Sequence, residues 1–497
     1  MIVFALLILV TTLVYVYVKW RYTYWSKLGV PYPEPVFFFG NVLEAFTMSS
    51  HISSLCEKWY NNYPTYPYTG YYKLLNPAIN LRDPDLIKDV LIKDHFSFHD
   101  NEQHFNKRFD SLMMHNPFVA SNDSWRKGRT VLTPLLTLLK VKSFHPSIVD
   151  SCEKLTNYLR TLPPNEDVEA KSLIARFATQ NVMRCLFSLD TKCFTETKNE
   201  FLDLGTNIFK PTSWSGIKLM IMSICPMLRD IMPFGFVPAY VGEWFRCFVK
   251  ELKEERLKSE QHQQDFLQML LSSVDKYDIN EAELAGYALA MFVDSYETSS
   301  GVLGFAIYEL ARNPDIQERL YEEITDVLAK YDGEFTFEAL HEMKYLENVI
   351  YETMRLDVVD ALISKICTKE YTLPLIEGQK EPVTIYPGTA IQISTRALHM
   401  DPKYYPDPET FDPNRFTEEE RRERHKAVYL SFGEGPRMCI GIKFALAQTK
   451  AGLMSIVRDF KVTISPNQKP VVMDNRASIY HARHGLIVNF TPRTKTK

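Results

Sequence analysis

The longest patterned segment, residues 280–313, most constrains what this chain can fold into. It reads NEAELAGYALAMFVDSYETSSGVLGFAIYELARN, a very long apolar run with helical periodicity that stops where Pro314 follows Asn313. Helical patterns also dominate from about residue 150 to residue 360. The sequence therefore predicts a mainly α protein that contains one very long apolar helix.

The remaining patterned segments are shorter. Amphipathic helices are expected over residues 315–331 and 340–356, and short strands over residues 71–83, 371–375, 382–386 and 389–394. No repeat, low-complexity tract or long linker interrupts the 497-residue sequence. We therefore expect one large domain over residues 42–497, mainly α with small β-sheets.

The first 18 residues carry no charge and are just long enough, at about 1.5 Å per residue, to cross a membrane. Aromatic residues suited to the membrane interface follow, interleaved with basic ones: Trp20, Tyr22, Tyr24 and Trp25 with Lys19, Arg21 and Lys27. We expect residues 1–20 to be a retained anchor whose C-terminal positive flank keeps the rest of the chain in the cytoplasm. A cleaved signal peptide is the alternative, but its basic start and small-residue cleavage site are not seen in the sequence.

Residues 21–41 are basic, aromatic and rich in proline. Within them, the prolines of GVPYPEPVFFFGN cannot continue a helix. The sequence therefore predicts a stiff elbow between the anchor and the body.

The eight cysteines are scattered, with no CxxC pair and no zinc-ligand spacing, and we expect reduced thiols in a cytoplasmic protein. Cys439 differs from the others in its neighbours, since FGEGPRMCIG leads directly into an apolar run. The positive end of a helix dipole favours thiolate over thiol, and the amides of Gly441 and Ile442 can point at the sulfur.

The glycines and the arginine of this loop suit a ligand. Gly433 and Gly435 permit a tight turn and a close approach to something large and flat, and Arg437 can pair with an anionic group on it. No second cysteine or histidine lies at chelating distance in sequence, which indicates an iron cofactor held by one thiolate. On local chemistry alone, a glycine-rich loop around a structural cysteine explains the pattern equally well.

The ten residues FGEGPRMCIG match at every position the haem-binding signature of the cytochrome P450 family, with its fixed residues at Phe432, Gly435, Arg437, Cys439 and Gly441. The chain resembles this family over its whole length, in particular the insect and vertebrate microsomal branches. The resemblance implies the cytochrome P450 fold. It also implies haem b, placed between the long distal helix and the proximal helix after the cysteine loop, with the Cys439 thiolate as its iron ligand.

Other segments resemble the same family. YETMR resembles its Glu-x-x-Arg helix, giving Glu352 and Arg355, and FDPNRF resembles its meander motif, which adds Arg415 to a buried structural triad. SWRKGR resembles the helix from which Trp125 and Arg129 face the haem propionates. Taken alone, Glu352 and Arg355 would also fit an exposed helical ion pair, and Trp125 a core indole.

The resemblance implies monooxygenation, in which one oxygen atom of O2 enters a lipophilic xenobiotic, lipid, steroid or hormone and the other leaves as water. The chain has no dinucleotide fingerprint, so the electron donor is expected to be a membrane-bound, NADPH-dependent cytochrome reductase, with cytochrome b5 as an optional second partner. The implied location is the endoplasmic reticulum membrane. A net charge of −4 gives no reason to expect a nucleic-acid partner.

Basic residues at four places are candidates for the face that docks the reductase: Arg126, Lys127, Lys443 and the run RRERHK at 421–426. The alternative is an ordinary solvated surface.

The sequence departs from the family in the long helix. The usual pattern is a small residue, glycine, any residue, an acid and threonine, whereas here DSYET places Asp294 and Ser295 first. Glu297 and Thr298 match the acid and alcohol that deliver protons to dioxygen. A carboxyl at position 294 needs a partner or tends to protonate, and Ser295 can bond back to a preceding carbonyl. We expect Asp294 to obstruct oxygen chemistry, or else to join the proton relay or bind a polar group of one substrate.

A second departure follows Arg355. The family's prolines are replaced by LDVVDALISK, so that Asp357 and Asp360 appear and Lys365 stands where an arginine toward a propionate is expected. Lysine holds a propionate as a point charge, without the bidentate fork of arginine, which predicts weaker haem retention.

Three functions remain open on these residues. The first is a membrane-bound monooxygenase of lipophilic molecules. The second is a haem-thiolate isomerase or dehydratase that needs no proton delivery to dioxygen. The third is a haem-binding protein with little turnover. The pocket walls are expected from residues 101–123, from about 200–245 and from the long helix, which are rich in Phe, Met, Ile and Leu.

Overall fold

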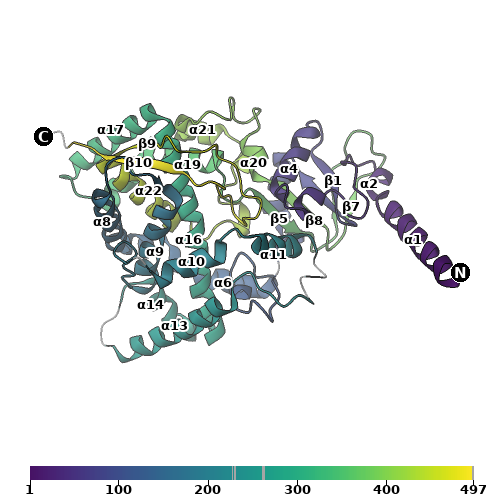
Figure 1. Ribbon diagram of the computed structural model, residues 1–497, viewed down its shortest axis with the longest axis horizontal. Helices are drawn as coiled ribbons and strands as arrows, with labels where there is room; N and C mark the ends of the chain where they lie inside the picture. The colour runs from purple at the N-terminus through teal and green to yellow at the C-terminus, as the bar shows by residue number, and fades with distance from the viewer. Residues whose placement is uncertain (104, 197, 226–227, 229–230, 260–262, 495–497) are drawn as a thin grey trace.

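The computed structural model describes residues 1–103, 105–196, 198–225, 228, 231–259 and 263–494. Position 104 and positions 226, 227, 229 and 230, which fall in the expected pocket walls, and the terminal positions 495–497 of the expected domain lie outside these residues. In Figure 1 a body of helices carries strands on both sides. The strands of residues 68–81 and 362–394 lie on the side nearest the N-terminus, and those of residues 460–492 lie on the side nearest the C-terminus. Helix α1 (Ile2–Arg21) projects away from the body.

Helices dominate the fold, as predicted. The longer ones are α1 (Ile2–Arg21), α4 (Ile52–Asn62), α6 (Asn122–Leu132), α8 (His145–Thr161), α9 (Ala170–Phe187), α10 (Glu200–Phe209), α11 (Ser213–Ile224), α13 (Ala239–Lys258), α16 (Glu281–Arg312), α17 (Pro314–Lys330), α19 (Lys344–Leu356) and α22 (Ile442–Asp459). Shorter α-helices are α2 (Tyr24–Lys27), α3 (Leu43–Phe46), α5 (Pro84–Lys88), α7 (Leu138–Ser143), α14 (Phe266–Leu271), α15 (Val274–Tyr277), α18 (Phe337–Glu342), α20 (Thr395–His399) and α21 (Glu418–Glu423). Single turns of other helix types are η1 (Asp89–Lys93), η2 (His95–Ser97), η3 (Met113–His115), η4 (Thr133–Leu136), η5 (Pro413–Phe416), η6 (Lys426–Val428) and η7 (Gly435–Arg437).

The long predicted helix is α16. Asn280 caps its start in a reciprocal capping box with Glu283, and Pro314 begins the next helix directly after Asn313. Most residues of α16 are buried, because other helices surround it.

The helix expected over residues 340–356 is in fact two helices, α18 and α19, separated at Met343. The cause lies in α17, where the Glu323 carboxylate accepts hydrogen bonds from the backbone amides of Tyr345 (2.6 Å) and Leu346 (2.8 Å). A side chain distant in sequence therefore caps the start of α19.

The strands form three small sheets. They are β1 (Tyr68–Lys73), β2 (Asn76–Leu81), β3 (Asp100–Asn101), β4 (Val168–Glu169), β5 (Leu362–Ile366), β6 (Tyr371–Thr372), β7 (Thr384–Ile385), β8 (Ala390–Ser394), β9 (Phe460–Ile464) and β10 (Ile487–Pro492). The five-stranded sheet has the order β1-β2-β8-β5-β3, in which only the β2–β8 pair is parallel. The other sheets are β4-β10-β9 and β6-β7. Each predicted strand segment contains a strand, but the segment 71–83 holds the end of β1 and the whole of β2, joined by a turn. The strands β3, β4, β5, β9 and β10 lie outside the predicted segments.

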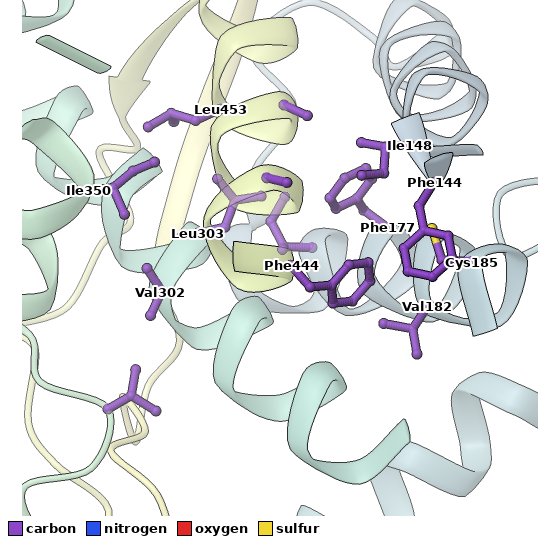
Figure 2. Packing of buried hydrophobic residues seen from close by; sticks show 14 of the residues in the cluster. Phe144, Ile148, Phe177, Val182, Cys185, Val302, Leu303, Ile350, Phe444 and Leu453 are labelled. Carbon is purple, nitrogen blue, oxygen red and sulfur yellow. The ribbon is translucent and has the colours of Figure 1, made fainter. Parts of the chain in front are cut away.

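The main core lies where α16 and α22 meet α8, α9 and α19. Figure 2 shows Leu303 of α16 beside Phe444 and Leu453 of α22, with Phe177 and Val182 of α9 opposite. Close contact is possible because Gly452 has no side chain: a Cβ there would lie 2.7 Å from Leu303. This packing fixes α22, and therefore the loop before it, against α16.

The elbow packs on the first sheet instead of standing free. Trp25 is fully buried over Gly70, where a Cβ would lie 2.5 Å from the indole, and its Nε1 donates to the Tyr71 carbonyl at 3.0 Å. Tyr22 is also buried, and its carbonyl accepts from the Tyr72 hydroxyl at 2.9 Å. The assignment of Trp25 and Tyr22 to a membrane-interface belt was therefore wrong, because β1 covers both rings.

Judged by its length and composition alone, helix α1 could cross a membrane, and only 6% of its apolar stretch is buried against the rest of the protein. A signal sequence meets the same criterion.

Candidate functional site

The loop that carries Cys439 is held between η1 and α22. Gly433 and Gly435 have φ angles of 67° and 76°, which favour glycine, and a Cβ on Gly435 would lie only 2.1 Å from the Leu91 carbonyl oxygen. The Cys439 amide donates to the Phe432 carbonyl at 2.8 Å, and α22 begins at Ile442. The close approach expected at Gly435 is therefore to the protein's own backbone.

The Cys439 thiol lies deep inside the protein, although neighbouring side chains leave part of the residue uncovered. Burial raises its pKa to about 11, and the Asp294 charge adds to the rise, whereas the Gly441 amide, which bonds to the sulfur, and Arg129 lower it. The expected support of the thiolate at the helix start is present, but burial outweighs it. A thiolate here needs a positive ion on the sulfur.

Basic side chains gather beside this loop. Arg437 Nη2 bonds to Asp100 Oδ1 at 2.9 Å, and its guanidinium carbon lies 4.3 Å from the centroid of the Trp125 ring. Arg129, on α6 with Trp125, donates through Nη1 to the Met438 carbonyl at 2.8 Å. The α6 motif and the cysteine-loop motif therefore meet in space.

Lys365 joins the same group from β5. Its side chain is buried and donates to Asn101 Oδ1 at 2.8 Å. Burial, with the nearby Arg437 charge, lowers the Lys365 pKa to about 7, and Asp100 opposes this shift. The β3–β5 pairing, which sets Asn101 opposite Lys365, brings these residues together.

The chemistry of this group fits an anionic ligand. The cations Arg129, Lys365 and Arg437 gather with the Asp100 carboxylate, and the buried Trp125 Nε1 has no hydrogen-bond partner among the described residues. A buried donor and excess positive charge both call for oxygen acceptors. Haem b carries such acceptors on its propionates, so the residues present fit the group that the sequence motif implies.

On the side of α16 that faces the cysteine loop, Asp294 is held by an amide. Asn116 Nδ2, just after η3, donates to Asp294 Oδ1 at 2.9 Å and Oδ2 at 3.1 Å. Burial raises the Asp294 pKa to about 6, and the Asn116 hydrogen bond lowers it. The carboxyl thus has both features expected of it, a partner and a tendency to protonate, and the partner is neutral.

Glu297 and Thr298 face different neighbours. Glu297 forms a buried ion pair with Lys171 of α9, and Lys171 Nζ also lies 2.8 Å from His481 Nδ1, in the segment between β9 and β10. The Thr298 hydroxyl donates to the Asp294 carbonyl, so Thr298 makes the bond back along the helix that was expected of Ser295.

The motif residues Glu352, Arg355 and Arg415 meet in a buried cluster. Arg355 donates to Glu352 through Nε (2.6 Å) and Nη2 (2.9 Å), and both side chains are fully buried. Arg415 Nε lies 3.5 Å from Glu352 Oε1. Arg355 also donates to the carbonyls of His399 (2.9 Å) and Thr410 (3.2 Å), so the cluster joins α19 to α20 and the segment before η5.

The segment after Arg355, where the sequence departs from the family pattern a second time, places two carboxyl groups in buried positions. Asp357 is buried, and one of its carboxylate oxygens finds no hydrogen-bond partner in the part of the chain that the structure describes. Burial, together with the Glu309 charge, raises its pKa well above the usual value. Burial raises the Asp360 pKa to about 6.

Several of the basic residues expected to dock the reductase already contact other groups of this chain. Lys127 Nζ lies 2.7 Å from both Glu283 oxygens, which ties α6 to α16. Arg126 pairs with Asp123 at 3.0 Å, while Lys443 stays exposed. In the run 421–426, the Arg424 guanidinium packs 4.7 Å from the Tyr405 ring centroid. Lys127 and Arg424 therefore support the fold.

Sequence reasoning missed the partners of these motif residues, namely Asn116, Asp100, Asn101, Lys171 and His481. Asn116, Asp100 and Asn101 lie in or beside the segment 101–123 predicted to wall the pocket, which was the available signal. A lone amide or acid in an irregular segment has no periodicity, so its partner cannot be identified without the fold.

Comparisons with known proteins agree with this geometry. The cytochrome P450 family profile matches residues 30–490. "Probable cytochrome P450 6a13" of Drosophila melanogaster is 34% identical over 97% of this chain and 98% of its own length. "Probable cytochrome P450 308a1" of the same organism is 32% identical (96% of each chain), and "Cytochrome P450 6k1" of Blattella germanica is 30% identical (99% of this chain, 97% of its own).

The family match covers most of the chain, and the helical fold with small sheets is the one expected of the family. The family uses haem b with a cysteine thiolate as axial ligand. The chain therefore belongs to the cytochrome P450 family and is a haem-thiolate monooxygenase.

Proposed function

We propose that this protein inserts one oxygen atom of O2 into a lipophilic small molecule, with Cys439 as the thiolate ligand of haem b and an NADPH-dependent cytochrome reductase as electron donor. Cytochrome b5 is an optional second donor. The observation that carries the proposal is Cys439 at the start of α22, with the Gly441 amide on its sulfur and the Asp294 charge close enough to shift its pKa.

The basic group beside the loop has the role of holding the propionates. Arg437, Arg129 and Lys365 supply charge there, and the unpaired Trp125 Nε1 supplies a donor. Phe432, Gly435 and Gly441 shape the loop. When bound, the haem supplies dioxygen activation, which no side chain provides.

In this proposal, residues of α16 deliver protons to the site. Thr298 lies one turn from Asp294 and is tied to its carbonyl, so its hydroxyl oxygen can pass a proton to the site. Glu297, whose carboxylate pairs with Lys171, stands behind this turn in the position of the relay's acid, and Lys171 in turn contacts His481.

The proposed location is the endoplasmic reticulum membrane, with α1 as the anchor and the body in the cytoplasm. The hydropathy of α1 and the basic residues at its C-terminal end support this orientation.

The thiolate assignment is tested by the ferrous carbon monoxide spectrum. Cys439→His should abolish the red-shifted band, whereas Cys247→Ser, at an exposed cysteine on α13, should keep it. A band that survived in Cys439→His would overturn the assignment. Product formation with purified reductase and NADPH tests the reaction itself.

The reductase contact is tested at Lys443, the exposed basic residue nearest the cysteine loop in sequence. Lys443→Glu should reduce reductase-supported turnover, with the loss largest at low salt, and should leave the carbon monoxide spectrum unchanged. Equal turnover at low salt would show that the reductase docks elsewhere.

One observation favours a second candidate. Asp294 and Ser295 alter the segment that serves dioxygen, which favours, as the second candidate for this chain's own reaction, a haem-thiolate isomerisation or dehydration, or haem binding with little turnover. Consumption of NADPH coupled to an oxygenated product separates the monooxygenase from both.

A further inference from the structure

Asp294 is a buried carboxylate with no cationic partner among the described residues. Burial and the Asn116 hydrogen bond account for its pKa shift, and no basic residue contributes to it. Lys171 of α9 is committed to Glu297, which lies one turn along α16 from Asp294. His115, the neighbour of Asn116, packs 6.3 Å from the Tyr287 ring, two turns before Asp294. The negative charge is therefore left without a counter-charge from the protein.

The carboxylate is oriented before any ligand arrives. Asn116 is 1% exposed, and its Oδ1 accepts from the Phe118 amide at 2.7 Å, which fixes the direction of Nδ2. Its carbonyl accepts from the amides of Val119 (3.0 Å) and Ala120 (2.8 Å). A fixed amide holds both carboxylate oxygens, so the Asp294 side chain loses little conformational freedom when a ligand binds.

The same carboxylate keeps unused acceptor capacity. A carboxylate has about four lone-pair sites, and Asn116 supplies one nitrogen to its two oxygens. The Asp294 side chain lies deep inside the protein but is not covered by neighbouring side chains, whereas Met291, Phe292 and Val293 before it are buried. Its charge acts on the Cys439 thiol, so the carboxyl lies on the side of α16 that faces the cysteine loop.

We propose that Asp294, positioned by Asn116, determines substrate specificity by binding the ammonium group of lipophilic amines. The inference rests on the proposed function, since it assumes that substrate lies on the side of α16 facing Cys439. An unpaired, desolvated carboxylate gains most from a ligand that brings its own positive charge, and the apolar neighbours select an apolar remainder.

The test uses haem-loaded full-length protein and two probes of matched shape. One is 4-phenylbutyl-trimethylammonium, and the other is its carbon isostere with a tert-butyl group in place of trimethylammonium. Neither has a nitrogen lone pair for iron, so binding measured by calorimetry reports the pocket. The wild type should bind the ammonium probe about tenfold or more tightly than the isostere, the effect of one desolvated ion pair, since trimethylammonium carries charge but no N–H.

Three variants test whether Asp294 and Asn116 cause the preference for the ammonium probe. Asp294→Asn should abolish it, and Asn116→Ala should reduce it while leaving affinity for the neutral isostere unchanged. Glu281→Gln removes the same charge from an exposed site on the same helix and should change nothing. If Asp294→Asn loses its haem, Asp294→Ala, which restores the small residue usual in the family, takes its place.

Equal affinity for the two probes in the wild type, or a preference that persists without the Asp294 carboxylate, would overturn the proposal. Failure of the proposed function looks different. In that case, the wild type itself would lack the red-shifted carbon monoxide band, whatever its probe affinities.

Discussion

At the residue scale, burial moves the ionisable groups of this site toward their neutral forms. The pKa of Cys439 is raised to about 11, that of Asp294 to about 6, and that of Lys365 is lowered to about 7. The protein alone therefore leaves these charges incompletely compensated. A cofactor that brings an iron cation to the thiol and carboxylates to the lysine reverses two of these shifts, which couples haem binding to protonation.

Lys365→Arg should make haem binding less sensitive to alkaline pH. Above its pKa of about 7, Lys365 must take up a proton before it can pair with a carboxylate, whereas arginine stays charged. Binding of haem also removes a proton from Cys439, which favours haem binding as pH rises. This effect is the same in both proteins and cancels from the ratio of their affinities. The ratio of variant to wild-type haem affinity should therefore rise above pH 7, by up to about tenfold per pH unit.

Titration of apoprotein with haem, followed by tryptophan quenching between pH 7 and 9, measures this ratio. Lys250→Arg, at an exposed position on α13, is the matched control and should keep a constant ratio. A constant ratio in Lys365→Arg as well would mean that Lys365 does not hold a propionate.

Glu352→Ala should strongly destabilise the protein. The change leaves Arg355, which is fully buried, without its carboxylate, and an unpaired buried charge costs about 3–5 kcal/mol. Thermal unfolding and haem yield should both fall. Glu418→Ala removes an exposed glutamate from a surface ion pair with Arg422 and should change neither by much. Normal haem yield in Glu352→Ala would contradict a structural role for the cluster.

At the scale of elements, the cysteine loop depends on how closely it approaches η1. Gly435→Ala adds a methyl group that would lie 2.1 Å from the Leu91 carbonyl, at a φ of 76°. Gly388 has a φ of 95° with no atom within 4 Å, so Gly388→Ala isolates the cost of the backbone angle, about 1–2 kcal/mol.

Gly435→Ala should lower the melting temperature more than Gly388→Ala does, and only Gly435→Ala should weaken the red-shifted carbon monoxide band. The reason is that the clash moves the loop and with it the sulfur. Equal effects of the two substitutions would show that the loop tolerates displacement from η1.

The elements that the sequence predicted well are those whose signal is local. The helix over 280–313, the strand segment over 71–83 and the motif around Cys439 each carry periodicity or spacing within a short stretch. The split between α18 and α19 could not be predicted, because Glu323 causes it from another helix. Likewise β5 gains its place by pairing with β8 and β3, and Asn116 gains its role only where α16 passes beside it.

At the scale of the whole molecule, the N-terminal segment and the body join at a defined point. Val18 is the one residue of α1 that is buried, and Arg21 donates to the Leu75 carbonyl at the tip of the β1–β2 hairpin (3.2 Å and 3.0 Å). Trp25 then fills the space above Gly70. The helix before Val18 is separable from the fold, whereas the residues after it belong to the body.

Deleting residues 2–17 should leave haem yield and melting temperature unchanged while weakening membrane association, because only exposed residues are removed. Deleting residues 2–26 also removes Trp25, and loss of a buried tryptophan costs about 3–5 kcal/mol, so the melting temperature should fall. Trp25→Ala in the full chain should reproduce that fall with membrane association intact. Sedimentation with membranes after a high-salt wash measures the first property, and thermal unfolding the second. Full retention of the shorter deletion on membranes would place the attachment on other apolar surfaces, and secretion of the full chain with a processed N-terminus would show that α1 is a signal sequence.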